Sequence, residues 1–236
     1  VIFISEVLMQ NSKTQRLTLT AIMLALATVL AIVCAYIPFL NLPFGGGFTI
    51  ASMLPIVVLS YMYGIRWGIV SSLIYSFIQL ALGAFTGGGY VISLFTVGSD
   101  NFMGVGQGIA IVLLDYILAY TVLGFGGIFR NKLSKTPALV LGTVVALALR
   151  YLVHIISGTI FFGIWAEWFF GQDGFYAIGK VILSHFTGTA LSIVYSIFYN
   201  GLYMIPEIII TAIVAVPISQ IPQIKKMTVE PEKKQA

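Results

Sequence analysis

Four ionisable side chains other than tyrosine lie well inside long apolar stretches of the sequence: Asp115, Arg150, His154 and Glu207. A charge at the centre of a bilayer costs about 2.5–3.5 kcal/mol on insertion scales, so such groups are usually paired or functional. Arg150 and His154 are four residues apart and therefore share one face of a helix. These groups predict either a structural Asp115–Arg150 pair or a polar pocket.

Aromatic and amide side chains accompany these polar groups. They are Tyr116, Tyr151, Tyr195, Tyr199, Asn200 and Tyr203. A planar heterocycle could stack on such rings and form hydrogen bonds with the carboxylate and the imidazole, which favours the pocket. We interpret a second aromatic group, at the end of an apolar stretch, as interfacial anchors. It comprises Trp165, Trp168, Phe169 and Phe170.

Glu207 follows Pro206, which removes a backbone hydrogen bond from a helix. We interpret it as structural or as a contact for a partner. The sequence contains no HExxH, GxSxG or paired intramembrane aspartate motif. Its two histidines are 31 positions apart, its only cysteine is Cys34, and the GVGQG at 104–108 lacks the Lys-Ser/Thr of a phosphate loop. We therefore expect neither an enzyme nor a metal site, and no cofactor.

The elements that carry these residues are unusually apolar. Of 236 residues, 59% are hydrophobic and 8% are charged, and the mean hydropathy is +1.02. Soluble domains carry about 25% charged and roughly 45–50% apolar residues. This composition excludes a cytosolic enzyme, a secreted disulfide scaffold and a disordered chain. The formal net charge of +4 is too small to indicate nucleic-acid binding.

Six apolar stretches predict an all-α, polytopic membrane protein with six transmembrane helices in one bundle. They cover 17–37, 48–64, 67–85, 104–128, 138–164 and 186–219. The bundle should occupy 17–219, between a segment at 1–16 and a polar tail at 220–236. The last stretch is long, and we expect its first part, near 184–194, to be interfacial. Residues 1–8 lack the basic start of a signal peptide, and we expect them to lie outside the fold.

The basic residues fix the expected orientation. With six crossings, ten Lys and Arg side chains fall on one side and only Lys180 on the other. This is the positive-inside pattern, and it predicts that both termini are cytoplasmic. The ten are Lys13, Arg16, Arg66, Arg130, Lys132, Lys135, Lys225, Lys226, Lys233 and Lys234.

Three long motifs resemble those of a known family. They are LDYILAYTVLGFGGIF (114–129), RYLVHIISGTIFFGIW (150–165) and YSIFYNGLYMIPEIIITA (195–212). LPFGGGFTIASMLPIV (42–57), GGYVISL (88–94) and the small-residue pair Ala21 and Ala25 give weaker support. On these residues the chain resembles the thiamine-specific S-components, the substrate-binding subunits of energy-coupling-factor vitamin transporters.

The resemblance implies a multi-pass subunit of the bacterial cell membrane that binds thiamine on the extracellular side. Delivery would require one transmembrane coupling protein and two cytoplasmic ATPases, with Ala21 and Ala25 on the face that contacts the coupling protein. Asp115 stands where the family typically has Glu, Phe162 where some members have Trp, and Gly46 where some carry a loop Trp. The substrate-binding residues implied are Tyr90, Asp115, Tyr116, Arg150, Tyr151, His154, Gly158, Phe162, Tyr195 and Asn200.

Thiamine chemistry agrees with these residue types. Thiamine is a cation with an aminopyrimidine ring, which a carboxylate, an imidazole and aromatic rings can bind together. Four alternatives remain open: a thiamine precursor, another vitamin such as riboflavin, a stand-alone secondary transporter and an intramembrane enzyme. A secondary transporter usually shows an inverted repeat, which this sequence lacks, and an enzyme would need a catalytic constellation.

Overall fold

The structure is a computed structural model that describes residues 2–42, 47–85 and 89–227. Within these ranges every named element is a helix, which confirms the all-α prediction. Gly46, Lys233, Lys234 and the end of the expected polar tail lie outside the described residues.

Five helical segments are long and apolar enough to cross a membrane. These are Lys13–Ala35 within α1 (Ile2–Ala35), α3 (Ile65–Phe85), Gly104–Gly127, α7 (Lys135–Phe161) and α10 (Gly188–Ile218). α1 begins at Ile2, so the expected segment at 1–16 is helical from that residue onward. α10 continues through Pro206 and Pro217 as one helix. Of the piece expected to be interfacial, residues 188–194 form the first turns of α10, and α9 (Tyr176–His185) ends two residues before that helix begins.

The second expected span differs from the prediction. Helix α2 covers only Leu54–Tyr63, ten residues, or about 15 Å against the roughly 30 Å of a hydrocarbon core. The residues before it are irregular, and Ala51 adopts a left-handed φ of 57°. The sequence 48–53 is apolar enough to read as helix, but tertiary hydrogen bonds described below hold it in another conformation. Among the described residues, five helices are therefore long and apolar enough to span a membrane, and α2 is a shorter apolar helix.

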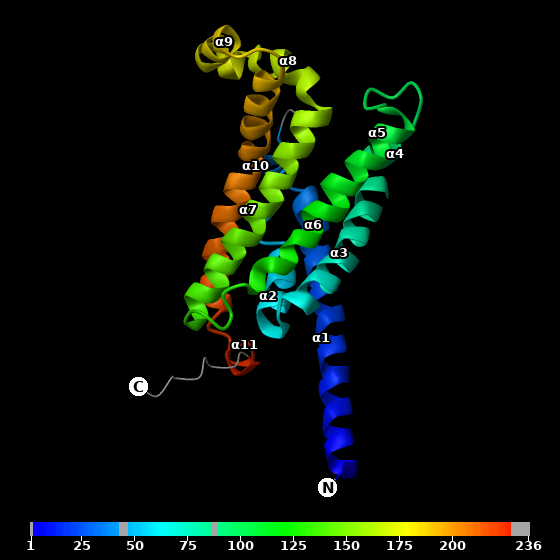
Figure 1. Cartoon of the computed structure of the whole chain (residues 1–236), viewed down its shortest axis with the longest axis vertical. Helices are drawn as coiled ribbons and strands as arrows, with labels where there is room; N and C mark the ends of the chain where they lie inside the picture. Colours follow the sequence, from blue (N-terminus) through cyan, green and yellow to red (C-terminus); the bar gives the residue numbers. More distant parts are fainter. Residues whose placement is uncertain (1, 43–46, 86–88, 228–236) are drawn as a thin grey trace.

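The chain alternates between two ends of the molecule. In Figure 1, α1 rises from the lower end, α2 returns to it, and α3 rises again. The segment from α5 descends, α7 ascends and α10 descends, so α1 begins and α10 ends at the same end. The upper end carries the short helices α4 (Tyr90–Ser93), α8 (Ala166–Phe170) and α9, while α11 (Pro222–Met227) lies at the lower end.

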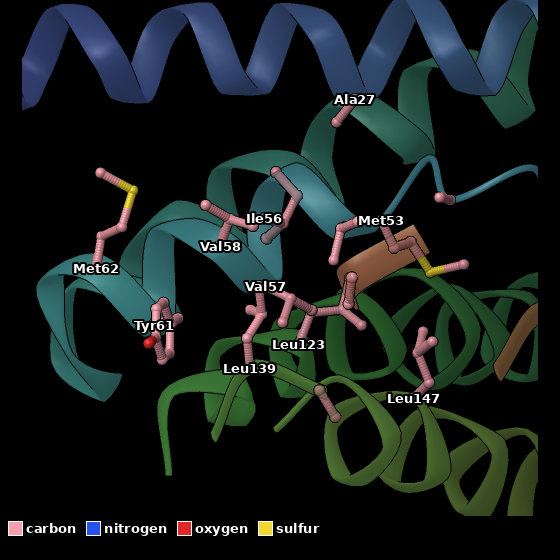
Figure 2. Close-up of a cluster of buried hydrophobic side chains, with 14 of the residues drawn as sticks. Ala27, Met53, Ile56, Val57, Val58, Tyr61, Met62, Leu123, Leu139 and Leu147 are labelled. Atoms are coloured by element: carbon pink, nitrogen blue, oxygen red, sulfur yellow. The ribbon is translucent and has the colours of Figure 1, made fainter. Parts of the chain in front are cut away.

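Helix α2 forms the centre of the larger apolar core. Ile56, Val57 and Leu59 are each 0% exposed. Figure 2 shows side chains of α2 between Ala27 of α1 on one side and Leu123 and Leu139 on the other. Burial on all sides explains why a ten-residue helix is stable here, because burying an aliphatic side chain contributes about 1.5–3 kcal/mol.

The segment at 104–127 changes helix type as it crosses the molecule. It begins as α5 (Gly104–Ile111), becomes the π-helix η2 (Val112–Leu118), and continues as α6 (Ala119–Thr121) and the 3-10 helix η3 (Val122–Gly127). π-helical turns are rare and occur frequently at functional sites. Asp115 and Tyr116 lie on this one.

Candidate functional site

A cavity of about 600 Å³ opens between η2, α7 and α10 and extends to the loops at the upper end. It is lined by charged, amide and aromatic side chains from segments far apart in sequence. The lining residues are Gly47, Tyr90, Asp100, Asn101, Met103, Asp115, Tyr116, Tyr120, Arg150, His154, Gly158, Phe162, Trp165, Trp168, Tyr195, Tyr199, Asn200 and Tyr203.

An acid–imidazole pair lies at the centre of this cavity. Oδ1 of Asp115 lies 3.1 Å from Nδ1 of His154, and their side chains are 16% and 10% exposed. A carboxylate only accepts, so the Nδ1–H of His154 donates to it. The buried Nε2 of His154 has no hydrogen-bond partner among the described residues. In a neutral imidazole with Nδ1 protonated, Nε2 is an acceptor available to a ligand.

Arg150 has other partners, and the structural Asp115–Arg150 pair considered above is not formed. One guanidinium nitrogen donates to the Tyr120 hydroxyl at 3.1 Å and another lies 2.9 Å from Sδ of Met53. The guanidinium carbon lies 4.4 Å from the centroid of the Tyr120 ring, within the range of cation–π attraction. Arg150 therefore joins α7 to η2–α6 and to the segment before α2, and leaves Asp115 to His154.

Both the nitrogen and the oxygen of the Asn200 side-chain amide form hydrogen bonds within the protein. Its Nδ2 donates to the backbone oxygens of His154 at 3.2 Å and Ser196 at 2.8 Å, and Tyr203 donates to its Oδ1. The bond to His154 joins α10 to α7 beside the imidazole, and the other two lie within α10. Gly158 permits this close approach, because a Cβ there would lie 2.2 Å from Oγ of Ser196.

Nine of the ten residues expected to bind substrate line this cavity. Tyr151 is the exception: its hydroxyl donates to the backbone oxygen of Ile197 at 2.6 Å, against Gly201 of α10. It follows Arg150 directly, which turns it by about 100° from the cavity face of α7. The other nine are Tyr90, Asp115, Tyr116, Arg150, His154, Gly158, Phe162, Tyr195 and Asn200.

The interpretation as interfacial anchors was wrong for Phe169 and Phe170, which are 0% and 1% exposed and pack in a second apolar core with Tyr195. Trp165 and Trp168 are exposed and line the cavity as an edge-to-face pair with centroids 6.1 Å apart, and for them an interfacial position stays a prediction. Short helices η4 (Gly163–Trp165) and α8 fold these rings back over the cavity, a turn that the apolar pattern does not reveal.

Sequence reasoning also missed Tyr120 and Asp100. Tyr120 follows Tyr116 by four residues in a quoted motif, so helical spacing could have placed it on the same face. Asp100 belongs to the loop between α4 and α5, where spacing carries no such information. The cavity lining therefore contains the carboxylates of both Asp115 and Asp100.

Tyr90, the first residue of the short helix α4, lines the cavity from outside the membrane-spanning helices. Burial raises the pKa of its phenol above the ordinary value, and the nearby Asp115 carboxylate acts in the same direction. The phenol therefore stays protonated at physiological pH and can donate a hydrogen bond.

Glu207 lies outside the cavity and binds the segment before α2. It is 2% exposed and accepts hydrogen bonds from the backbone N–H of Thr49, from the Thr49 hydroxyl at 2.7 Å and from the Thr211 hydroxyl at 3.3 Å. These contacts support the structural interpretation of Glu207, because its carboxylate connects α10 to Thr49. The bonds from Thr49 to Glu207 also help to explain the irregular backbone at 49–53, because they hold Thr49 against α10.

Comparison with known proteins identifies the family. The model of the family described as "Thiamine transporter protein (Thia_YuaJ)" matches residues 17–172. This chain belongs to that family. It is also 33% identical over 215 residues to the "Thiamine transporter ThiT" of Bacillus subtilis (strain 168), covering 87% of this chain and 90% of that protein.

Membership in the thiamine transporter family confirms the resemblance drawn from the three long motifs. The matched range includes all of η2 and α7, and thus Asp115, Arg150 and His154. Together with the five long apolar helices, it establishes a multi-pass protein of the bacterial cell membrane.

Proposed function

We propose that this chain binds thiamine in the 600 Å³ cavity from the extracellular side. We further propose that it passes the vitamin inward with an ATP-driven coupling module formed by separate proteins. The Asp115–His154 pair inside an aromatic cavity, in a chain of the thiamine transporter family, carries the proposal. The volume lies within the range of about 300–1,000 Å³ common for small-ligand sites.

Each half of thiamine finds a complementary group. The free Nε2 of His154 can accept from the amino group of the pyrimidine, and Asp115 supplies negative charge to a cationic ligand. Tyr195, Trp165 and Trp168 offer ring faces or edges to the two heterocycles. A cation against aromatic rings gains about 0.5–2 kcal/mol, more as it is desolvated. Riboflavin, which carries no positive charge, would gain no charge–charge attraction from Asp115.

Energy coupling through partners rests on two features of the chain. The sequence has no GxxxxGK[ST] phosphate loop, so ATP hydrolysis would occur elsewhere. Ala21 and Ala25 are exposed on one face of α1, whereas Ala27 faces the core. Small side chains allow close approach of another membrane helix, and we propose that this face docks the coupling protein.

Six crossings with cytoplasmic termini remain part of the proposal. For this topology, α2 and the residues before it would together complete the second crossing. Arg66 is exposed in the first turn of α3 and Lys132 in the loop before α7, and both helices begin at the lower end of the molecule in Figure 1; the positive-inside rule requires such residues at a cytoplasmic end. Asp173 is exposed between α8 and α9, which lie at the upper end.

A binding panel on the purified protein tests the ligand. We would measure affinities for thiamine, its pyrimidine precursor, its phosphate esters and riboflavin by titration calorimetry. Thiamine should bind at least tenfold more tightly than the pyrimidine and riboflavin. Equal or tighter binding of the pyrimidine or of riboflavin would overturn the ligand assignment.

Uptake into proteoliposomes tests the coupling. Proteoliposomes that contain this chain, its coupling protein and the ATPases should accumulate radiolabelled thiamine. They should do so only when ATP is present on the side of the membrane where the ATPases lie. Accumulation by this chain alone, driven by an ion gradient, would instead identify a secondary transporter.

A further inference from the structure

The lining of the cavity changes from buried to exposed toward the upper end of the molecule. Arg150, His154 and Asn200 are 8%, 8% and 5% exposed, whereas Trp165 and Trp168 are 42% and 50% exposed. Asp100 and Asn101 also belong to the exposed group. These exposed residues define the mouth of the cavity, and Asp100 supplies its carboxylate.

The backbone holds Asp100 in a compact turn. The loop between α4 and α5 is closed at its base by a hydrogen bond from Met103 N–H to the Leu94 oxygen at 3.0 Å. Nearer the tip, Phe102 N–H donates to the Ser99 oxygen at 3.0 Å, and the Ser99 hydroxyl accepts from Asn101 N–H at 3.2 Å. Leu94 is fully buried and fixes the loop to the bundle. The Asp100 side chain is therefore presented at a defined place on the rim.

The charge of Asp100 is not neutralised by the protein. Within the described part of the chain, its carboxylate has neither an ion-pair nor a hydrogen-bond partner, whereas Asp115 is bonded to His154. The other exposed acids at this end, Glu167 and Asp173, do not line the cavity. A ligand approaching from outside thus meets Asp100 as the first carboxylate in its path.

We propose that Asp100 is a specificity-determining residue that selects cationic ligands at the mouth, before they reach Asp115; this inference rests on the proposed thiamine binding. A rim charge acts mainly on the association rate and on its salt dependence, because it acts before the ligand is desolvated. The Trp165–Trp168 pair beside it offers aromatic surface that also attracts cations. Selection would therefore occur in two stages, by charge at the rim and by hydrogen bonding in the interior.

Stopped-flow binding measures this role directly. The ligands are thiamine and an uncharged analogue in which a thiophene ring replaces the thiazolium. The variants are Asp100→Asn, which keeps the shape of the side chain, and Asp173→Asn as a matched exposed acid outside the cavity. At low salt, Asp100→Asn should slow thiamine association about three- to tenfold, with a weaker salt dependence. The uncharged analogue should associate at the wild-type rate, and Asp173→Asn should change neither.

Three outcomes overturn the inference. Unchanged thiamine association in a folded Asp100→Asn variant would show that the rim charge is not used, and would leave the proposed function intact. Equal slowing of both ligands would assign Asp100 to loop structure. Failure of the wild-type protein to bind thiamine would overturn the proposed function itself. The variant Asp100→Glu should retain at least half of the wild-type rate.

Discussion

Asp115 of η2 forms its hydrogen bond with His154 of α7, at 3.1 Å, although Arg150 lies one turn from His154 on α7. The guanidinium is turned toward Tyr120 and Met53 instead. Arg150 and the Asp115–His154 pair therefore have different contacts within one cavity. Arg150 links α7 to α6 and to the segment before α2, and the Asp115–His154 pair presents a carboxylate and an imidazole nitrogen without a hydrogen-bond partner to the cavity.

The two tyrosines Tyr151 and Tyr203 should respond differently to loss of the hydroxyl. Tyr151 donates outside the cavity, so Tyr151→Phe should leave ligand affinity within threefold of wild type. Tyr203 lines the cavity and donates to Asn200. Leaving that buried acceptor unpaired destabilises the folded protein by about 1–3 kcal/mol, so Tyr203→Phe should lower the unfolding temperature; because Asn200 then loses its fixed orientation beside His154, we also expect binding to weaken about fivefold or more. Titrations of both variants with thiamine check this, and more than tenfold weakening by Tyr151→Phe would return that side chain to the binding site.

Glu207→Gln should loosen the segment before α2. Hydrogen bonds to a charged group contribute about 1.5–3 kcal/mol, and the amide cannot accept from Thr49 and Thr211 as the carboxylate does. Cys34 reports the change, since it is 3% exposed and its sulfur accepts from Ile50 N–H at 3.3 Å. We expect a lower unfolding temperature and about tenfold faster alkylation of Cys34. The exposed Glu167 supplies the control, as Glu167→Gln. Unchanged alkylation in Glu207→Gln would show that Glu207 does not hold this segment.

Bulk on the exposed face of α1 should separate binding from uptake. Ala21→Trp or Ala25→Trp would hold a partner helix away, because membrane helices associate through close backbone approach. Thiamine binding should stay at the wild-type level while uptake in cells falls at least tenfold. Ile213→Trp places the same bulk on an exposed position of α10 and should not affect uptake. Wild-type uptake by the α1 variants would exclude this face from docking.

Labelling of single cysteines should establish the orientation. Positions 132 and 173 are both exposed; the first lies just before α7, which begins at the lower end, and the second between α8 and α9 at the upper end. In a Cys34→Ala background, a cysteine at 173 should react with an impermeant thiol reagent on intact cells, and a cysteine at 132 only after the cells are opened. The reverse result would invert the topology and place the cavity mouth in the cytoplasm.

The sequence predicts the helices better than it predicts their contacts. The long spans follow from uninterrupted apolar runs, because lipid requires the backbone to satisfy its own hydrogen bonds. Residues 48–53 continue the apolar stretch, but the N–H and hydroxyl of Thr49 donate to Glu207, 158 positions away, and Ile50 N–H donates to Cys34. No local pattern reveals such a distant partner. That is why the second span appears as a short, fully buried helix.

The same limit applies to the site. Helical spacing and the family motifs identified nine residues of one cavity, of which Arg150, His154, Gly158, Tyr195 and Asn200 lie on the long helices α7 and α10. The spacing did not decide whether Asp115 would pair with Arg150 or His154, since both lie on one face of α7 and η2 is π-helical. Asp100, Trp165 and Trp168 come from loops and short helices whose fold depends on tertiary packing.

The central claim is that Asp115 binds the ligand through its charge, and Asp115→Asn tests it most directly. Asparagine keeps the size of the side chain and an oxygen that can accept from His154, but removes the charge. Thiamine titrations of both proteins, with thermal unfolding measured in the absence of ligand, separate binding from stability. We predict a folded variant whose affinity for thiamine falls roughly 30-fold to several thousand-fold, or about 2–5 kcal/mol. A well-folded variant that binds thiamine within about threefold of wild type would contradict the account.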